Sequence, residues 1–103
     1  MESIGRRGTT PTVPFTVKDF DLDNITDLCL VMCQNGNVIV KRKLNEVQIE
    51  GDTINVHLSQ EDTLRFKAGT YIASQIKFKI GEQVFATDIV FSTIDDCLCQ
   101  EVI

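Results

Sequence analysis

Aromatic residues are scarce in this sequence, which has no Trp and one Tyr beside six Phe in 103 residues. A carbohydrate-binding surface usually presents exposed aromatic rings, whose flat apolar faces stack on sugars. Only Tyr71 and Phe20 are candidates for such a ring. The sequence therefore does not predict a sugar-binding protein.

Long apolar segments are also missing. The longest apolar run, residues 28–33, has the length of a strand, whereas a membrane-spanning helix needs about 20 such residues. The first twelve residues contain no apolar stretch of the kind that a signal peptide carries. We therefore expect a protein that is made in the cytoplasm and is not secreted.

Positive charge is limited, because ten Lys and Arg face fifteen Asp and Glu and the net charge is −5. Binding to nucleic acid depends on clustered Lys and Arg that neutralise phosphates. The only basic clusters along the chain are Arg6-Arg7 and residues 41–43. We interpret both as solvated surface and predict no nucleic-acid or membrane partner.

Short alternating segments separated by turn residues fill most of the chain. Asn35-Gly36 lies between two apolar runs, which is the strongest local signal for a hairpin with a type I′ turn. Gly51-Asp52 and Gly81-Glu82 separate two further pairs of strand-like segments, the last being residues 71–80 and 83–92. About seven strands at this spacing predict an all-β fold, an antiparallel immunoglobulin-like sandwich.

Two segments depart from simple alternation. Residues 28–33 are apolar at every position, so we expect both faces of a strand over residues 25–34 to be covered. Ser59 can cap a helix, and the acidic residues that follow it suit the positive end of a helix dipole. The sequence therefore predicts one short helical turn near residues 59–66.

The first twelve residues differ in character from the rest. Gly5, Gly8 and Pro11 interrupt regular structure, so residues 1–12 are predicted to be an extended arm and residues 13–103 a single sandwich domain. An arm of this kind can lie across a neighbouring subunit, and exposed sheet edges offer a second contact by strand addition. The candidate partner contacts on the arm are Arg6, Arg7, Thr9 and Thr10.

Two groups of residues contain side chains that can bind metals, the acidic residues near 19–23 and the four cysteines. Asp19, Asp21 and Asp23 resemble the start of a calcium loop, but Asn24 and Leu30 stand where an EF-hand needs Gly and Glu. An irregular calcium site stays open as an alternative to a solvated acidic turn. We predict the solvated turn, and no metal site.

The four cysteines could suggest zinc. Cys29 and Cys33 lie four residues apart on one predicted strand, which separates them by about 13 Å. Since zinc holds its thiolates at about 2.3 Å, these two cannot share an ion. Cys97 and Cys99 lie in a predicted tail, where reactivity or pairing between chains stays open.

Catalytic motifs are also few. His57, the only histidine, lies on the predicted polar face of a strand, and we interpret it as a surface residue. No nucleophile elbow and no glycine-rich phosphate loop is present. We therefore predict a protein that is not an enzyme and that has no cofactor.

Five segments carry a resemblance to a known family, namely residues 3–12, 49–54, 58–66, 86–90 and 101–103. They resemble small proteins encoded in tailed phages and prophages of Firmicutes. They are also similar to the immunoglobulin-like N-terminal domain of phage baseplate upper proteins. None of the shared motifs is catalytic, so they indicate lineage rather than chemistry.

The resemblance implies a non-enzymatic structural role in a phage or prophage particle, through protein–protein contacts in the tail or baseplate. Its partners would be other phage structural proteins and further copies of itself. The chain would be made in the cytoplasm of the bacterial host and become part of the virion. The alternative is a β-sandwich binding module outside a virion, either adhesin-like or regulatory.

Overall fold

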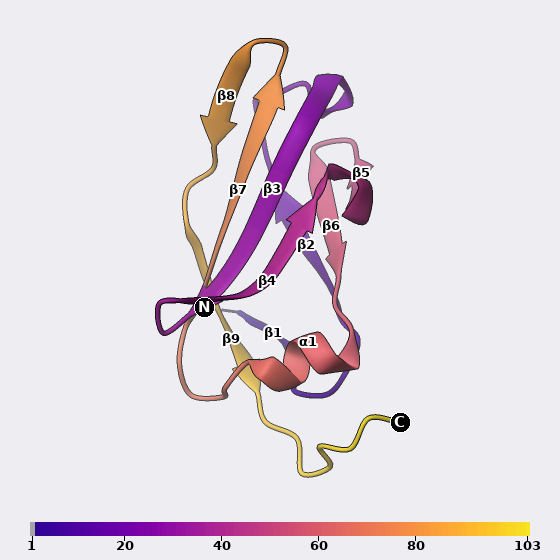
Figure 1. Cartoon of the computed structure of the whole chain (residues 1–103), viewed down its shortest axis with the longest axis vertical. Coiled ribbons are helices and arrows are strands. Elements are labelled where there is room, and N and C mark those ends of the chain that lie inside the picture. Colours follow the sequence, from indigo (N-terminus) through magenta and orange to yellow (C-terminus); the bar gives the residue numbers. More distant parts are fainter. Residues whose placement is uncertain (1) are drawn as a thin grey trace.

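The computed structural model describes residues 2–103 and is built mainly of short strands (Figure 1). The elements are β1 (Ser3–Arg6), β2 (Thr12–Thr16), η1 (Leu22–Asn24), β3 (Ile25–Gln34), β4 (Asn37–Lys43), η2 (Leu44–Glu46), β5 (Gln48–Glu50), β6 (Thr53–His57), α1 (Gln60–Arg65), β7 (Ile72–Ile80), β8 (Gln83–Ala86) and β9 (Val90–Asp95).

The strands form two sheets. The larger sheet has the order β1-β9-β7-β3-β4, with β8 also paired to β7, and the smaller sheet has the order β2-β6-β5. In immunoglobulin terms β9-β7-β3-β4 corresponds to G-F-C-C′ and β2-β6-β5 to B-E-D, as in variable-type domains, with β1 added beside β9. The predicted all-β immunoglobulin-like sandwich is therefore confirmed.

The core lies between the two sheets. Alternation along each strand sends one set of side chains inward, and Leu30, Ile54 and Ile72 have no exposed surface. Phe66, just after α1, is equally buried and closes one end of the core. At the other end Phe20, Phe78 and Phe85 pack together with ring centroids 4.8–5.6 Å apart.

The predicted local features are largely present. Asn35 and Gly36 have φ angles of 53° and 79° and join β3 to β4, as a type I′ turn requires. Ser59 caps α1: its Oγ accepts a hydrogen bond from the Asp62 N–H at 3.1 Å, and Asp62 Oδ2 accepts one from the Ser59 N–H at 2.9 Å. This reciprocal pair confirms the predicted helical turn.

The segment predicted as one strand over residues 83–92 consists of two strands, β8 and β9, both antiparallel to β7. Thr87 interrupts them: its N–H donates to the Ile76 carbonyl at 2.9 Å, while its hydroxyl accepts from the Ile76 N–H at 3.1 Å. Because a side chain replaces the backbone acceptor here, regular pairing stops. This break and β1 raise the strand number to nine within residues 2–103.

The N-terminal segment differs from the predicted arm. Ser3–Arg6 forms β1, which pairs in parallel with β9, and Thr12 already belongs to β2. Met1 lies outside the described residues. The pairing joins the two ends of the chain, so no local sequence pattern could indicate it.

The two faces of β3 also differ from the expectation. Leu28, Leu30 and Met32 face the smaller sheet and are at most 1% exposed. The alternate residues Cys29, Val31 and Cys33 are only partly buried. No helix or strand of the described chain lies in front of β3 in Figure 1. The prediction that both faces are covered is therefore wrong for this chain alone.

Candidate partner-binding surface

Arg7, one of the four predicted partner contacts, is occupied within its own chain. Its Nε donates to the Phe66 carbonyl at 2.7 Å and its Nη2 to the Leu64 carbonyl at 2.9 Å. Its Nη1 lies 3.3 Å from the Asp96 carboxylate. Arg7 thus ties the end of α1 to the segment after β9, which leaves little of its guanidinium for a partner.

Arg6, Thr9 and Thr10 lie at the same corner of the fold and are exposed. Arg6 donates to the Asp96 carbonyl at 2.9 Å, and the Thr9 hydroxyl donates to the Arg6 carbonyl at 2.6 Å. The Thr9 carbonyl in turn accepts from the Thr63 hydroxyl at 2.8 Å. Arg6 and Thr9 therefore help to hold the N-terminal segment on the domain.

Asp96 takes part in the same corner. The Cys97 N–H donates to its carboxylate at 2.9 Å. This hydrogen bond, followed by the one from Arg7, holds the pKa of Asp96 below its ordinary value. The corner is thus a structural junction of the two chain ends.

The other sequence candidates stay apart. Asp19, Asp21 and Asp23 are exposed, and Asp21 accepts a hydrogen bond from the Asn24 amide at 2.6 Å. Within residues 2–103 no three potential metal-ligating side chains lie close enough to hold an ion. The four cysteines carry free thiols, with Cys99 exposed.

His57 is exposed, and its Nδ1 lies 3.2 Å from the Thr12 hydroxyl. It lines a depression of about 340 Å³ on the smaller sheet, together with the amides of Asn45, Gln48 and Asn55. The contact joins neighbouring strands in register, since Thr12 pairs with His57. We interpret the hydrogen bond as a cross-strand contact.

The outer face of the larger sheet is the surface on which distant residues come together. We define it as the side of β3, β4, β7, β8 and β9 that points away from the smaller sheet. Cys29 lies between Lys43 of β4 and Lys77 of β7, and in the next row Val31 lies beside Lys41. Lysines from two separate parts of the sequence are thereby placed around one apolar strand.

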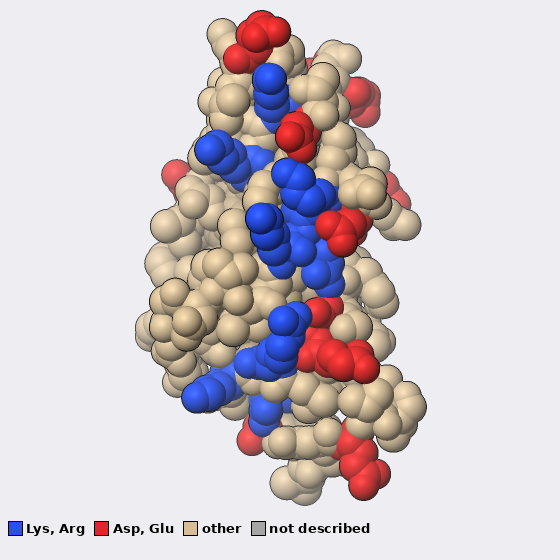
Figure 2. Space-filling model, viewed as in Figure 1, with Lys and Arg blue, Asp and Glu red and all other residues tan. Residues whose placement is uncertain are grey.

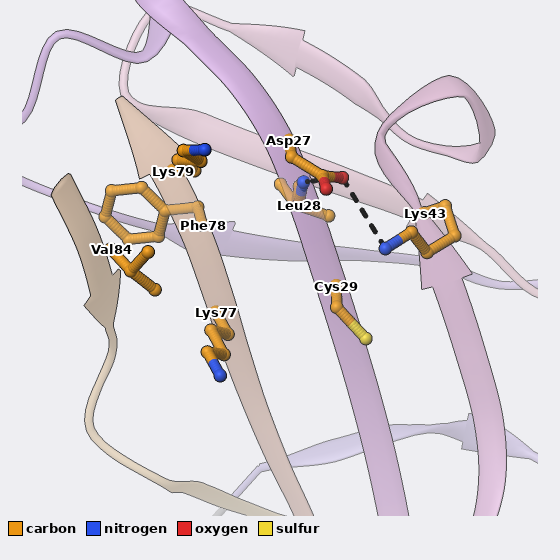
Figure 3. Close-up of a pocket in the computed structure, with 8 residues that line it drawn as sticks. All are labelled: Asp27, Leu28, Cys29, Lys43, Lys77, Phe78, Lys79 and Val84. Carbon is orange, nitrogen blue, oxygen red and sulfur yellow. Dashed lines mark hydrogen bonds and ion pairs between the residues drawn. The ribbon is translucent and has the colours of Figure 1, made fainter. Parts of the chain in front are cut away.

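A shallow pocket of about 340 Å³ marks the basic half of this face (Figure 3). Asp27 lies beside it, with its carboxylate 3.5 Å from the Lys43 ammonium. The Leu28 N–H donates to the same carboxylate at 2.8 Å, and this hydrogen bond, with Lys43, lowers the pKa of Asp27. The lining residues are Asp27, Leu28, Cys29, Lys43, Lys77, Phe78, Lys79 and Val84.

The other half of the outer face is apolar. Cys33 lies between Val38 of β4 and Ala73 of β7, and Ala73 is in register with Phe91 of β9. Val38 is 58% exposed and Phe91 is 52% exposed. We call these four residues the apolar row.

The charges on this face contrast with those of the whole chain. Figure 2 shows Lys and Arg side chains gathered along the middle of the face, although the net charge is −5. The lysine stems can cover apolar surface while their ammonium groups stay in water. Such a face attracts acidic groups and can then bury apolar ones.

Sequence reasoning treated residues 41–43 as solvated surface and missed this face. Alternation alone places Lys41 with Lys43 and Lys77 with Lys79. What alternation does not show is that β4 and β7 flank the same strand. The available signal was the unbroken apolar run in β3, which demands cover on both sides.

No protein-family model, curated protein or solved structure matches the chain significantly. No helix within residues 2–103 is both long and apolar enough to cross a membrane. The outer face is therefore interpreted from its own residues.

Proposed function

We propose that this chain is a non-enzymatic structural protein of a phage or prophage particle. It takes part in tail or baseplate assembly through protein–protein contacts, and the outer face of the larger sheet is its main contact surface. The observation that carries the proposal is the open outer side of β3, where Cys29, Val31 and Cys33 lie partly exposed.

A strand that is apolar at every position is typical of a sheet covered on both faces. Here the smaller sheet covers the inner face, and the outer side chains of β3 are covered only in part. Contiguous exposed apolar surface of this kind marks interaction sites in folded proteins. A second protein would supply the cover that the chain itself lacks.

The lysines indicate the chemistry of the partner. Lys41, Lys43 and Lys77 are exposed and flank the apolar side chains in register. An acidic partner is drawn to such a surface over long range, which raises its rate of association. Rim charges of this kind also favour one docking orientation over others.

The setting in a phage particle rests on the resemblance of the five segments described above. The same surface would equally serve a binding module outside a virion, so the experiment must address the setting directly. Induced phage particles from the source strain are purified and analysed by quantitative mass spectrometry. We expect this chain in a fixed copy number relative to tail proteins.

A matched pair of variants then tests the surface. Lys77→Glu changes the outer face, whereas Lys18→Glu makes the same change in the loop after β2. We expect the first to reduce incorporation into particles and the second to leave it unchanged. Absence of the wild-type chain from purified particles would exclude the virion role, and equal incorporation of both variants would exclude the outer face.

A further inference from the structure

The segment after β9 is exposed but not loose. Leu98 is 106% exposed and Ile103 is 96% exposed. The Asp96 carbonyl accepts a hydrogen bond from Arg6 at 2.9 Å, and the Gln60 amide side chain makes two bonds of 2.8 Å with the backbone of Ile103. Residues 97–103, here called the C-terminal loop, are thus held at both ends while their apolar side chains face water.

The composition of this loop is complementary to that of the outer face. Leu98, Val102 and Ile103 are exposed apolar residues. Glu101 lies among them, and Asp95 and Asp96 directly precede the loop. An acidic and apolar segment is therefore matched by a basic and apolar face on the same molecule.

We propose that the C-terminal loop of one copy docks on the outer face of a second copy. The proposal rests on the proposed function, because it names the first partner of that same surface. Leu98 and Val102 would cover the apolar row, and Glu101 would lie near Lys41 and Lys77.

The dimensions of the two surfaces agree. If they became fully extended, residues 98–103 would span about 20 Å, and the four neighbouring strands β9, β7, β3 and β4 span about 14 Å at their usual spacing. One loop is therefore long enough to cross the whole outer face.

The geometry of the contact has a consequence for assembly. The loop projects beyond the end of the sandwich that α1 closes (Figure 1), whereas the outer face lies along the side of the sandwich. Because the two surfaces differ, each docked copy still offers a free face or a free loop. Such head-to-tail contacts produce rings or open chains, and they close into a two-fold dimer only where two copies exchange loops reciprocally.

The first test is sedimentation velocity of the full chain over a range of protein concentrations. We expect association at low salt that weakens at high salt, because exposed charges are screened. Lys77→Glu should raise the concentration for half-association by about tenfold. Its control is Lys18→Glu, and Leu98→Ser with Val102→Ser is the corresponding loop variant. Thermal unfolding checks that every variant is folded.

The second test mixes the face variant, Lys77→Glu, with the loop variant, Leu98→Ser with Val102→Ser. The face variant keeps an intact loop and the loop variant keeps an intact face, so the mixture can form one kind of contact only. We expect a 1:1 dimer that grows no further. A wild-type chain that stays monomeric, or association that neither variant weakens, overturns the proposal. Binding of a labelled oligonucleotide by a monomeric chain would overturn it as well.

Thiol alkylation supplies an independent readout. Cys33 lies in the apolar row and Cys99 in the C-terminal loop, so both should react more slowly in the associated protein. At the same protein concentration the Lys77→Glu variant should show less protection. A chain that is monomeric yet present in phage particles would refute this inference and leave the proposed function standing. Self-association of a chain that is absent from particles would refute the proposed function and leave this inference standing.

Discussion

The inner and outer faces of β3 carry equally apolar residues but have different surroundings. Leu28, Leu30 and Met32 on the inner face are at most 1% exposed, whereas Val31 on the outer face remains partly exposed. The smaller sheet lies over one face and no strand or helix of the described chain lies over the other. One strand thus serves folding on one side and, in our proposal, recognition on the other.

Truncation on the two faces should give the largest difference in stability. Leu30→Ala leaves a cavity between the sheets and should lower the free energy of unfolding by about 2–5 kcal/mol. Val31→Ala on the outer face removes less buried surface and should cost less than about 1 kcal/mol. Urea denaturation of both variants measures the contrast. Similar losses would mean that the outer face is as buried as the inner one.

The same division holds on β4 for charged residues. Arg42 donates to Asp62 at 2.5 Å and its side chain is 19% exposed, whereas Lys41 points to the outer face. Arg42→Ala should lower the free energy of unfolding by about 1–3 kcal/mol, because a buried carboxylate loses a partner. Lys41→Ala should change it by less than about 0.5 kcal/mol. Equal effects in chemical denaturation would contradict the distinction.

Asp62 should make the stability of the fold depend on pH. Burial raises its pKa, but hydrogen bonds from the Ser59 N–H and Arg65, together with the charge of Arg42, outweigh burial and hold the pKa below its ordinary value. The folded state then binds fewer protons than the unfolded state. The resulting stability is fully present above the unfolded pKa and is lost as the pH falls through the folded pKa.

Denaturation midpoints measured between neutral and strongly acidic pH test this expectation. Asp62→Asn should lose stability at neutral pH and show a shallower decline in acid. A residual decline should remain, because the pKa values of Asp27 and Asp96 are lowered too. An unchanged acid profile would show that Asp62 does not contribute.

The inner face of β7 contains one polar residue, Ser74, and its replacement should change the free energy of unfolding by less than the variants above. Ser74 is 1% exposed, and its hydroxyl has no hydrogen-bond partner among the described residues. Ser74→Ala should therefore leave stability unchanged or raise it by up to about 1 kcal/mol. Ser59→Ala should have the opposite sign, since that hydroxyl caps α1. Destabilisation by both variants would indicate a bond to Ser74 that the described residues do not supply.

Features set by neighbouring residues were predictable from the sequence. The Asn35-Gly36 turn and the Ser59 cap depend on interactions within a few residues, and both are present. The fold class followed from strand number and spacing. By contrast, the pairing of β1 with β9 and the side-chain interruption at Thr87 depend on contacts between distant segments.

The candidate surface was only half predictable for the same reason. Alternation identifies which lysines share a face of their own strand, but the row Lys43-Cys29-Lys77 needs the register of three strands. Arg7 was predicted as a partner contact because it lies on the predicted extended arm. Its acceptors, the carbonyls of Leu64 and Phe66, lie beyond any local pattern.

Replacement of Asp27 should have the smallest effect on stability. It should nevertheless change the strength of association. Its ion pair with Lys43 spans 3.5 Å and both side chains are largely exposed, so Asp27→Asn should lower the denaturation midpoint only slightly. The same change removes the acidic group beside the basic pocket and should strengthen docking of an acidic segment. Sedimentation velocity at low salt, with Glu82→Gln in the β7–β8 turn as the control, measures this. Weaker association of Asp27→Asn would show that attraction between the lysines and an acidic loop does not drive the contact.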